Sequence, residues 1–136
     1  MRVTVDANIL FACLIRDSAT RRLVLNPTLT LFAPEFLKDE LAAHIIEIKE
    51  KSGMNDEELL RMIQMVFAQI AFVPDKDLKP FLHPAASLIA DPKDWLYLAC
   101  ALHEDTTIWS NDNDFGSQKR IRVFNTKELM SIVGSL

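Results

Sequence analysis

The chain has 136 residues, of which 49% are hydrophobic and 25% are charged, and its formal net charge at pH 7 is −4. This length predicts one domain spanning residues 1–136, and the composition is that of an ordinary globular protein. The negative charge argues against a protein that holds nucleic acid through an overall basic field, but it is compatible with a nuclease whose site is built of carboxylates.

Five short strand-like segments follow one another along the chain, with helical patterns between nearly all of them. They cover residues 3–5, 29–33, 70–73, 107–110 and 122–124. Neighbouring parallel strands need crossover helices. The alternation therefore predicts an α/β fold, a single-domain three-layer α/β/α sandwich with a central, mainly parallel sheet.

Four helix starts can be read from the sequence. Pro34 fits the first turn of a helix that continues to residue 51, and Asn55 with Glu58 forms a capping-box pattern. Asp91 is placed to cap a helix that is apolar almost all round and is therefore predicted to be buried. Thr126 can cap the last helix.

No apolar stretch reaches the roughly 18 residues that a membrane-spanning helix needs. The opening MRVTVDANIL also lacks the layout of a signal peptide. We therefore expect a cytoplasmic protein that does not bind a membrane. Cys13 and Cys100 lie in apolar helical patterns, which favours buried free thiols over a disulfide or a metal pair.

Acidic residues follow two of the predicted strands. Asp6 comes after the first strand, and Asp112 and Asp114 come after the fourth. If these strands are parallel neighbours, their carboxyl ends share one edge of the sheet, where open α/β sheets bind ligands. The three acids are therefore expected to share a site.

Two helical acids could join this site. Glu40 lies on the shoulder of an apolar stripe, whereas Asp39 points to the opposite side, and Asp94 lies in the first turn of the helix that Asp91 caps. Each has a structural alternative. A glutamate at the edge of a stripe is commonly solvated, and acids in a first helical turn stabilise the helix dipole.

A cluster of these acids would require a cation. Two carboxylates ~4 Å apart repel by roughly 4 kcal/mol at an effective dielectric near 20. The cluster is therefore tolerable only if it is protonated, paired with cations or holding a metal ion. An all-oxygen set, with no Cys or His at metal-ligand spacing, suits Mg²⁺ or Mn²⁺ rather than zinc.

Four segments together resemble the PIN-domain family of metal-dependent ribonucleases, which includes the VapC-type toxins of toxin–antitoxin pairs. The segments are VTVDANIL (3–10), APEFLKDEL (33–41), DPKDWLYLACAL (91–102) and IWSNDNDF (108–115). Each segment is weak alone, but their order and spacing cover nearly the whole chain. The resemblance implies a PIN-like version of the predicted sandwich.

The resemblance also implies a set of site residues. The implied catalytic and metal-binding quartet is Asp6, Glu40, Asp94 and Asp112, the implied further ligand is Asp114, and the implied supporting residues are Asn8 and Ser110. Asp91 competes with Asp94 for the third position, and Asp94 is preferred for its distance from the small-residue run LACAL. The division of labour between Asp112 and Asp114 stays open.

The implied activity is hydrolysis of RNA phosphodiester bonds with Mg²⁺ or Mn²⁺. The implied partners are an RNA substrate, a cognate antitoxin and a second copy of the chain. Residues 56–70 offer a surface for the homodimer, although a core role for their apolar stripe is the stronger reading. Residues 117–122, SQKRIR, are the best candidate for phosphate contacts, with a merely solvated face as the alternative.

Two other functions are compatible with parts of this pattern. One is a catalytically inactive PIN-like module that only binds a partner protein. The other is a phosphorelay receiver domain, which needs adjacent acids after its first strand and a lysine after its fifth. The chain has only Asp6 at the first of these positions, and Lys127 fits the second loosely.

Overall fold

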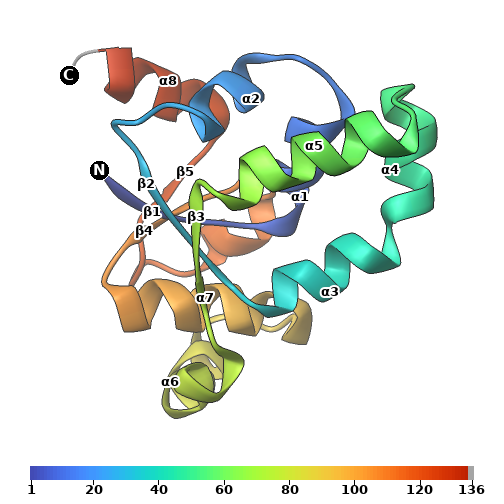
Figure 1. Ribbon diagram of the computed structural model, residues 1–136. Helices are drawn as coiled ribbons and strands as arrows, with labels where there is room; N and C mark the ends of the chain where they lie inside the picture. Colours follow the sequence, from blue (N-terminus) through green and yellow to red (C-terminus); the bar gives the residue numbers. More distant parts are fainter. Residues whose placement is uncertain (135–136) are drawn as a thin grey trace.

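The five predicted strands form one parallel sheet in the computed structural model, which describes residues 1–134 (Figure 1). The strands are β1 (Arg2–Val5), β2 (Thr30–Pro34), β3 (Ile70–Val73), β4 (Thr107–Trp109) and β5 (Val123–Phe124). Every neighbouring pair is parallel. All five lie where the apolar runs predict them, with ends that differ by one residue at most.

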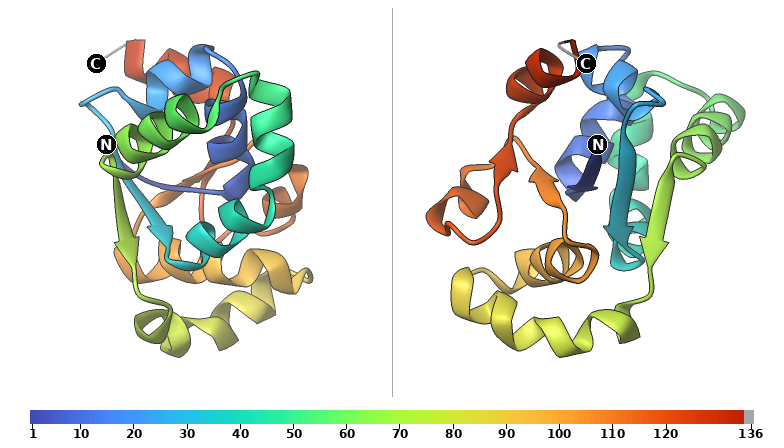
Figure 2. Two further views of the ribbon diagram at one scale, coloured as in Figure 1. Left: turned by 45° about the vertical axis from the view of Figure 1, so that its right-hand side comes forward. Right: turned by 90° about the vertical axis from the view of Figure 1, so that its left-hand side faces the viewer.

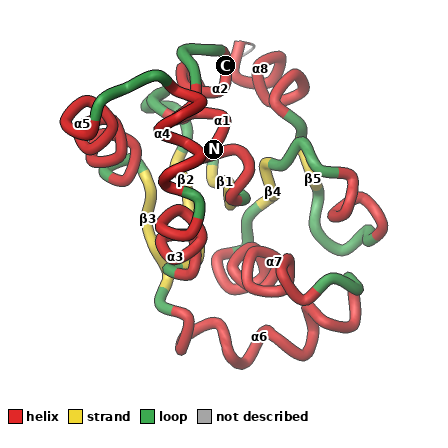
Figure 3. The backbone as a smooth tube through the Cα atoms, turned by 90° about the vertical axis from the view of Figure 1, so that its right-hand side faces the viewer, coloured by secondary structure: helices red, strands yellow, loops and turns green. Residues whose placement is uncertain are grey.

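Helices cover both sides of the sheet. They are α1 (Ala7–Ile15), α2 (Ala19–Val24), α3 (Phe36–Ala43), α4 (Ile45–Ser52), α5 (Asp56–Phe67), α6 (Asp75–Leu88), α7 (Pro92–Glu104), the 3₁₀ helix η1 (Asn113–Ser117) and α8 (Thr126–Gly134). Helices α6 and α7 lie on one side, and α1, α2 and α8 lie on the other (Figures 2 and 3). The predicted three-layer α/β sandwich is confirmed. None of the helices within residues 1–134 is long and apolar enough to cross a membrane.

The strand order is β3-β2-β1-β4-β5, so the chain direction across the sheet reverses between β1 and β4. Val5 at the end of β1 pairs with Trp109 at the end of β4. The residues that follow these two strands therefore start from the same edge, at the switch point where open sheets bind ligands. This order also differs from the 2-1-3-4-5 order of flavodoxin-like receiver domains, which excludes that alternative.

Helix α7 is the buried helix, as predicted. Its segment Leu98, Ala99, Cys100 and Ala101 is fully buried, and α7 packs against β1, β2 and β4. The small side chains in this segment allow the helix to lie close to the sheet. Cys13 and Cys100 are free, buried thiols, which confirms their predicted state.

The predicted helix from Pro34 to residue 51 is wrong in two respects. Pro34 is the last residue of β2, and the helical segment is divided into α3 and α4 by His44. The backbone of His44 has φ −111° and ψ 9°, and its N–H donates to the Leu41 carbonyl, which closes α3. The break changes the direction of the chain so that α4 packs against α1. A single straight helix after β2 would continue in the direction of α3 instead.

Of the other predicted caps, two are confirmed and one is wrong. Asn55 and Glu58 form the complete capping box of α5, and Asp91 accepts a hydrogen bond from the Lys93 N–H at the start of α7. The last helix is capped by Asn125, whose side chain accepts a hydrogen bond from the Glu128 N–H (2.8 Å). The Thr126 hydroxyl, the predicted cap, instead accepts a hydrogen bond from the indole of Trp109 (3.1 Å).

Candidate functional site

Asp6 joins the end of β1 to the start of α1. Its backbone N–H donates to the Trp109 carbonyl (3.3 Å), which continues the pairing of β1 with β4 by one residue. Its Oδ1 accepts a hydrogen bond from the Ile9 N–H (3.0 Å) and so caps α1. The other oxygen, Oδ2, accepts a hydrogen bond from the Ser110 hydroxyl. Both oxygens are therefore fixed on a residue that is only 5% exposed.

Ser110 connects Asp6 to the acids that follow β4. It is 2% exposed, and its Oγ accepts a hydrogen bond from the Asp112 N–H (3.0 Å) while donating to Asp6. Asp112 then caps the 3₁₀ helix η1, since its Oδ1 accepts a hydrogen bond from the Asp114 N–H (3.1 Å). This chain of hydrogen bonds connects Asp6 through Ser110 to Asp112, and Asp112 to the backbone of Asp114. Ser110 thus makes a hydrogen bond to Asp6, while the supporting role that the family resemblance implies for it stays a prediction.

Asp91, Asp94 and Asp114 form a second group of neighbouring acids. One carboxylate oxygen from each lies within 4.8 Å of the others. Asp94 is half-buried, and its Oδ2 is buried without any hydrogen-bond partner within the described residues. A buried carboxylate oxygen without a donor is costly, so a bound proton or a bound cation would stabilise this atom.

Glu40 reaches the site from α3. It accepts a hydrogen bond at Oε1 from the hydroxyl of Tyr97, which lies on α7 one turn after Asp94. Tyr97 is 2% exposed, whereas Glu40 is half-buried. The hydroxyl of the enclosed Tyr97 side chain therefore fixes the position of the more exposed Glu40 carboxylate. The orientation of the two α3 acids confirms the periodicity prediction, since the neighbouring Asp39 is exposed.

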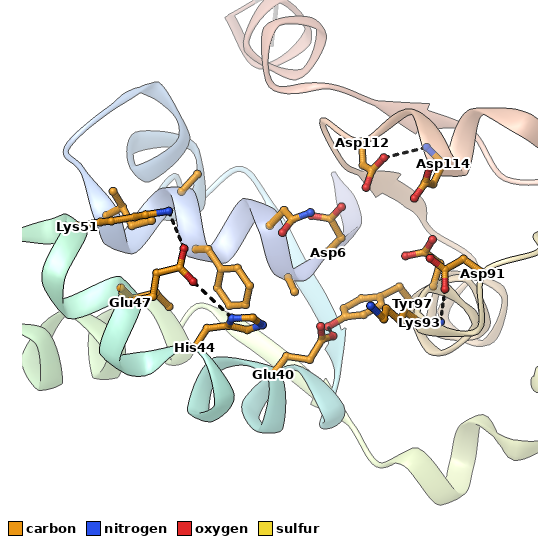
Figure 4. Close-up of a pocket in the computed structure, with 17 residues that line it drawn as sticks. Asp6, Glu40, His44, Glu47, Lys51, Asp91, Lys93, Tyr97, Asp112 and Asp114 are labelled. Carbon is orange, nitrogen blue, oxygen red and sulfur yellow. Dashed lines mark hydrogen bonds and ion pairs between the residues drawn. The ribbon is translucent and has the colours of Figure 1, made fainter.

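All these acids line one pocket of about 570 Å³ at the carboxyl edge of the sheet (Figure 4). The six that gather there are Asp6, Glu40, Asp91, Asp94, Asp112 and Asp114. Within residues 1–134 no lysine, arginine or histidine forms an ion pair with any of them. The protein itself therefore leaves their charge uncompensated.

Burial and mutual repulsion raise the pKa of the two central acids. The pKa of Asp6 rises from 3.8 to about 6 mainly because the group is desolvated, with further contributions from Asp112 and Glu40. The pKa of Asp94 also rises to about 6, through desolvation and then through the charges of Asp91 and Asp114. Both carboxylates therefore hold a proton more tightly than an ordinary aspartate does, and a bound cation would stabilise their anionic form.

These residues fit a divalent metal ion. All the donors are oxygens, as Mg²⁺ and Mn²⁺ prefer, and the orphaned Asp94 Oδ2 lacks only a positive partner. Cys13 and Cys100 lie outside the pocket, so no soft ligand is available there. The described residues thus offer a hard, oxygen-only cation site.

The sequence of the chain also matches a known protein family. The model of the PIN domain matches residues 4–129 of the chain. The chain belongs to the PIN-domain family. No curated protein matches the chain in sequence.

Solved structures show the same PIN fold. One is that of VapBC2 from Rickettsia felis bound to a DNA fragment from its promoter, with a TM-score of 0.69 and 16% identity over 92% of this chain and 98% of that chain. Another is that of FitAB bound to the IR36 DNA fragment, with a TM-score of 0.56 and 12% identity over 91% of this chain and 94% of that chain. At these identities the likeness concerns the fold alone.

The structure of this PIN domain brings together all five acids expected from the sequence, and their catalytic and metal-binding roles stay predictions. Asn8 also lines the pocket, but within residues 1–134 it makes no hydrogen bond to an acid, so its bracing role stays a prediction too. None of residues 117–122 lines the pocket. The lysines that do are Lys51 and Lys93.

The sequence offers Asp91 either as the cap of α7 or as an alternative to Asp94, and in the structure it both caps α7 and lies in the acidic group with Asp94 and Asp114. Sequence reasoning missed Tyr97 altogether. The sequence does contain a signal for Tyr97, which is a phenol on an otherwise apolar face of a buried helix. A buried hydroxyl needs a hydrogen-bond partner, so a polar group could have been expected beside it.

Proposed function

We propose that this PIN domain is a ribonuclease that hydrolyses RNA phosphodiester bonds with Mg²⁺ or Mn²⁺, and that it is the toxin of a type II toxin–antitoxin pair. One observation carries the proposal. Acids from four separate segments converge on one pocket at the switch point of the sheet, without any cationic partner among residues 1–134. Membership of a family of metal-dependent nucleases supports the same reaction.

Asp6 and Asp94 would be the central metal ligands, because they are the two acids whose charge the fold disfavours most. Asp112 would complete the set directly or through water, with Asp114 beside it. When bound, the cation lowers the pKa of a coordinated water and offsets charge on the scissile phosphate. The hydrogen bond from Ser110 keeps Asp6 oriented toward this set.

Glu40 would be either a further ligand or the general base. Its Oε1 is occupied by the Tyr97 hydroxyl, so its Oε2 is the atom that can take a proton from the attacking water. Tyr97 donates this hydrogen bond and therefore fixes the orientation of the Glu40 carboxylate. The hydrogen bond to Oε1 thus leaves Oε2 of Glu40 as the proton acceptor at one wall of the pocket.

The proposed protein partners come from family resemblance and from the surface of α5. The likeness to chains of the VapBC2 and FitAB complexes supports a cognate antitoxin. Helix α5 buries Leu59 and Val66 but leaves Leu60 56% and Met65 52% exposed. These two exposed apolar side chains are the basis on which we propose a homodimer that uses α5, in the cytoplasm where an RNA substrate is available.

Cleavage of labelled single-stranded RNA tests the activity. We expect cleavage with Mg²⁺ or Mn²⁺, no cleavage with EDTA, and loss of at least about a hundredfold in rate for Asp6→Asn or Asp94→Asn. Asp39→Asn is the matched control, because Asp39 is an exposed acid on α3 that does not line the pocket. Full activity of folded Asp6→Asn would refute the assignment. Inertness of the wild-type protein toward varied RNAs with both metals would favour the inactive, partner-binding module instead.

A further inference from the structure

The pocket extends past the acids along α1 and α4, and its walls change character there (Figure 4). We call this part the α1–α4 wall. It consists of Phe11, Ala12, Ile15, His44, Ile48 and the Glu47–Lys51 pair. The acidic end of the pocket suits a cation and a phosphate, whereas this wall presents mostly apolar and aromatic groups.

Two rings dominate the α1–α4 wall. The centroids of Phe11 and His44 are 5.1 Å apart, and their planes meet at 57°. Phe11 is half-buried, and 49% of the His44 side chain is exposed, so both rings remain accessible from the pocket. Aromatic rings in a groove beside the site of chemistry are the groups on which unpaired nucleic-acid bases stack.

The charges on the α1–α4 wall compensate one another. Lys51 Nζ lies 2.6 Å from Glu47 Oε1, and His44 Nδ1 lies 3.8 Å from Glu47 Oε2. A phosphate would require a cation that is not already paired. An uncharged base does not require an unpaired cation. It could pack against this wall, which is apolar in the middle and polar at its rim.

We propose that the α1–α4 wall is a nucleobase subsite, on which a base next to the scissile phosphate stacks against Phe11 and His44. This inference rests on the proposed ribonuclease function, because the acidic end of the same pocket would hold the phosphate. It also specifies the substrate as single-stranded RNA. Bases in a duplex are already stacked on their neighbours and cannot turn toward a protein ring.

Fluorescence anisotropy with a labelled single-stranded RNA of roughly 12 nucleotides tests the subsite in Mg²⁺. All variants carry Glu40→Gln, which removes the proposed general base but keeps the proposed ligands Asp6, Asp94 and Asp112, so that cleavage is suppressed while the metal ion can still bind. Phe11→Leu keeps an apolar side chain but removes the ring, and we expect it to weaken RNA binding by about tenfold. Phe11→Tyr keeps the ring and is expected to restore binding.

Two further variants complement Phe11→Leu, and the far-UV circular dichroism of each variant is compared with that of the parent before RNA binding is measured. His44→Ala removes the second ring from an exposed position, and it too is expected to weaken binding. Phe67→Leu is the matched control, because Phe67 faces Phe72 at the same centroid distance of 5.1 Å but does not line the pocket. We expect it to bind RNA as the parent does.

Unchanged affinity in both Phe11→Leu and His44→Ala would overturn the proposal, and this is the result expected if the wall receives a protein segment such as an antitoxin tail. Failure of the parent to bind RNA, or an equal loss in Phe67→Leu, would overturn it as well. Cleavage assays in chains that retain Glu40 separate the two hypotheses. Cleavage that does not depend on Phe11 refutes the subsite alone, whereas Phe11-dependent binding without cleavage supports the subsite and refutes the ribonuclease.

Discussion

Asp6 has two roles that conflict in the metal-free protein. It caps α1 and anchors Ser110, yet its buried charge is disfavoured, since its pKa rises from 3.8 to about 6. This rise in pKa means that the fold disfavours the ionised form of Asp6, relative to the protonated form, by a free energy of about 3 kcal/mol. The residue best placed to hold a metal ion thus destabilises the fold when no ion is bound.

Replacing Asp6 with asparagine should therefore stabilise the metal-free protein. Asparagine is an equally good helix cap, because its Oδ1 can accept the hydrogen bond from the Ile9 N–H while its Nδ2 donates to the Ser110 Oγ. We expect unfolding near pH 7.5 in EDTA to cost about 1–3 kcal/mol more in Asp6→Asn than in the wild-type protein. Chemical denaturation measures this difference. A variant less stable than wild type would contradict the account.

The raised pKa values also predict how stability depends on pH. Because the folded-state pKa of Asp6 lies above that of the unfolded chain, its proton stabilises the fold fully below about pH 4, and this stabilisation is lost as the pH rises through about 6. In EDTA the stability of wild type relative to Asp6→Asn should fall over this window. Melting temperatures of both proteins at a series of pH values measure the difference. A constant difference would show that Asp6 is not perturbed by burial.

Tyr97 should act on the site through Glu40. Tyr97→Phe keeps the buried ring but removes the hydrogen bond to Oε1, so Glu40 can turn toward solvent. We expect a loss of about tenfold in turnover or metal affinity, with an unchanged KM for RNA and a change in stability of about 1 kcal/mol or less. Steady-state kinetics and a metal titration of the same sample measure these quantities. A fall in stability with unchanged turnover and unchanged metal affinity would indicate a purely structural role for Tyr97.

At the scale of elements, the break at His44 forms the pocket. Helix α3 presents Glu40 to the acids, and the turn at His44 directs α4 back along α1, so that Glu47 and Lys51 complete the far end. The sequence offers no signal for this break, because the segment contains neither glycine nor proline and its apolar stripe continues through Ile48. Packing of α4 on α1 overrides the local helical preference.

Caps with a paired side chain were easier to predict than this break. The Asn55–Glu58 box was predicted and forms, with hydrogen bonds of 2.8 and 3.2 Å. Thr126 fails as a cap because Asn125, one residue earlier, forms its own box with Glu128. The indole of Trp109 then uses the threonine hydroxyl, a tertiary contact that local sequence does not reveal.

The capping box also allows a test of stability that is separate from the site. Asn55→Ala should destabilise the protein by about 1 kcal/mol, because it leaves an N–H of the first turn of α5 without its partner. Since Asn55 does not line the pocket, the response to metal should stay as in the wild-type protein. Thermal melts with and without Mg²⁺ measure both effects. An altered metal response would mean that α5 is coupled to the site.

At the scale of the whole molecule, the sheet topology brings the distant acids together. Alternating strands and helices predicted the parallel sheet, and the acids after the first and fourth strands predicted a shared edge. Adjacent, parallel β1 and β4 fulfil that condition. The dual role of Asp91 and the contact from Tyr97 could not be predicted, because both depend on how α7 is oriented over the edge of the sheet.

A metal titration followed by melting temperature tests the central claim most directly. Any ion that binds only the folded state stabilises it by RT ln(1 + [L]/Kd), about 2.7 kcal/mol at a concentration of 100 Kd. We predict that Mg²⁺ or Mn²⁺ raises the melting temperature of wild type and of Asp39→Asn by several degrees, but leaves that of Asp6→Asn and Asp94→Asn nearly unchanged. An unchanged wild-type melting curve at millimolar metal, or equal rises in all four proteins, would contradict the account.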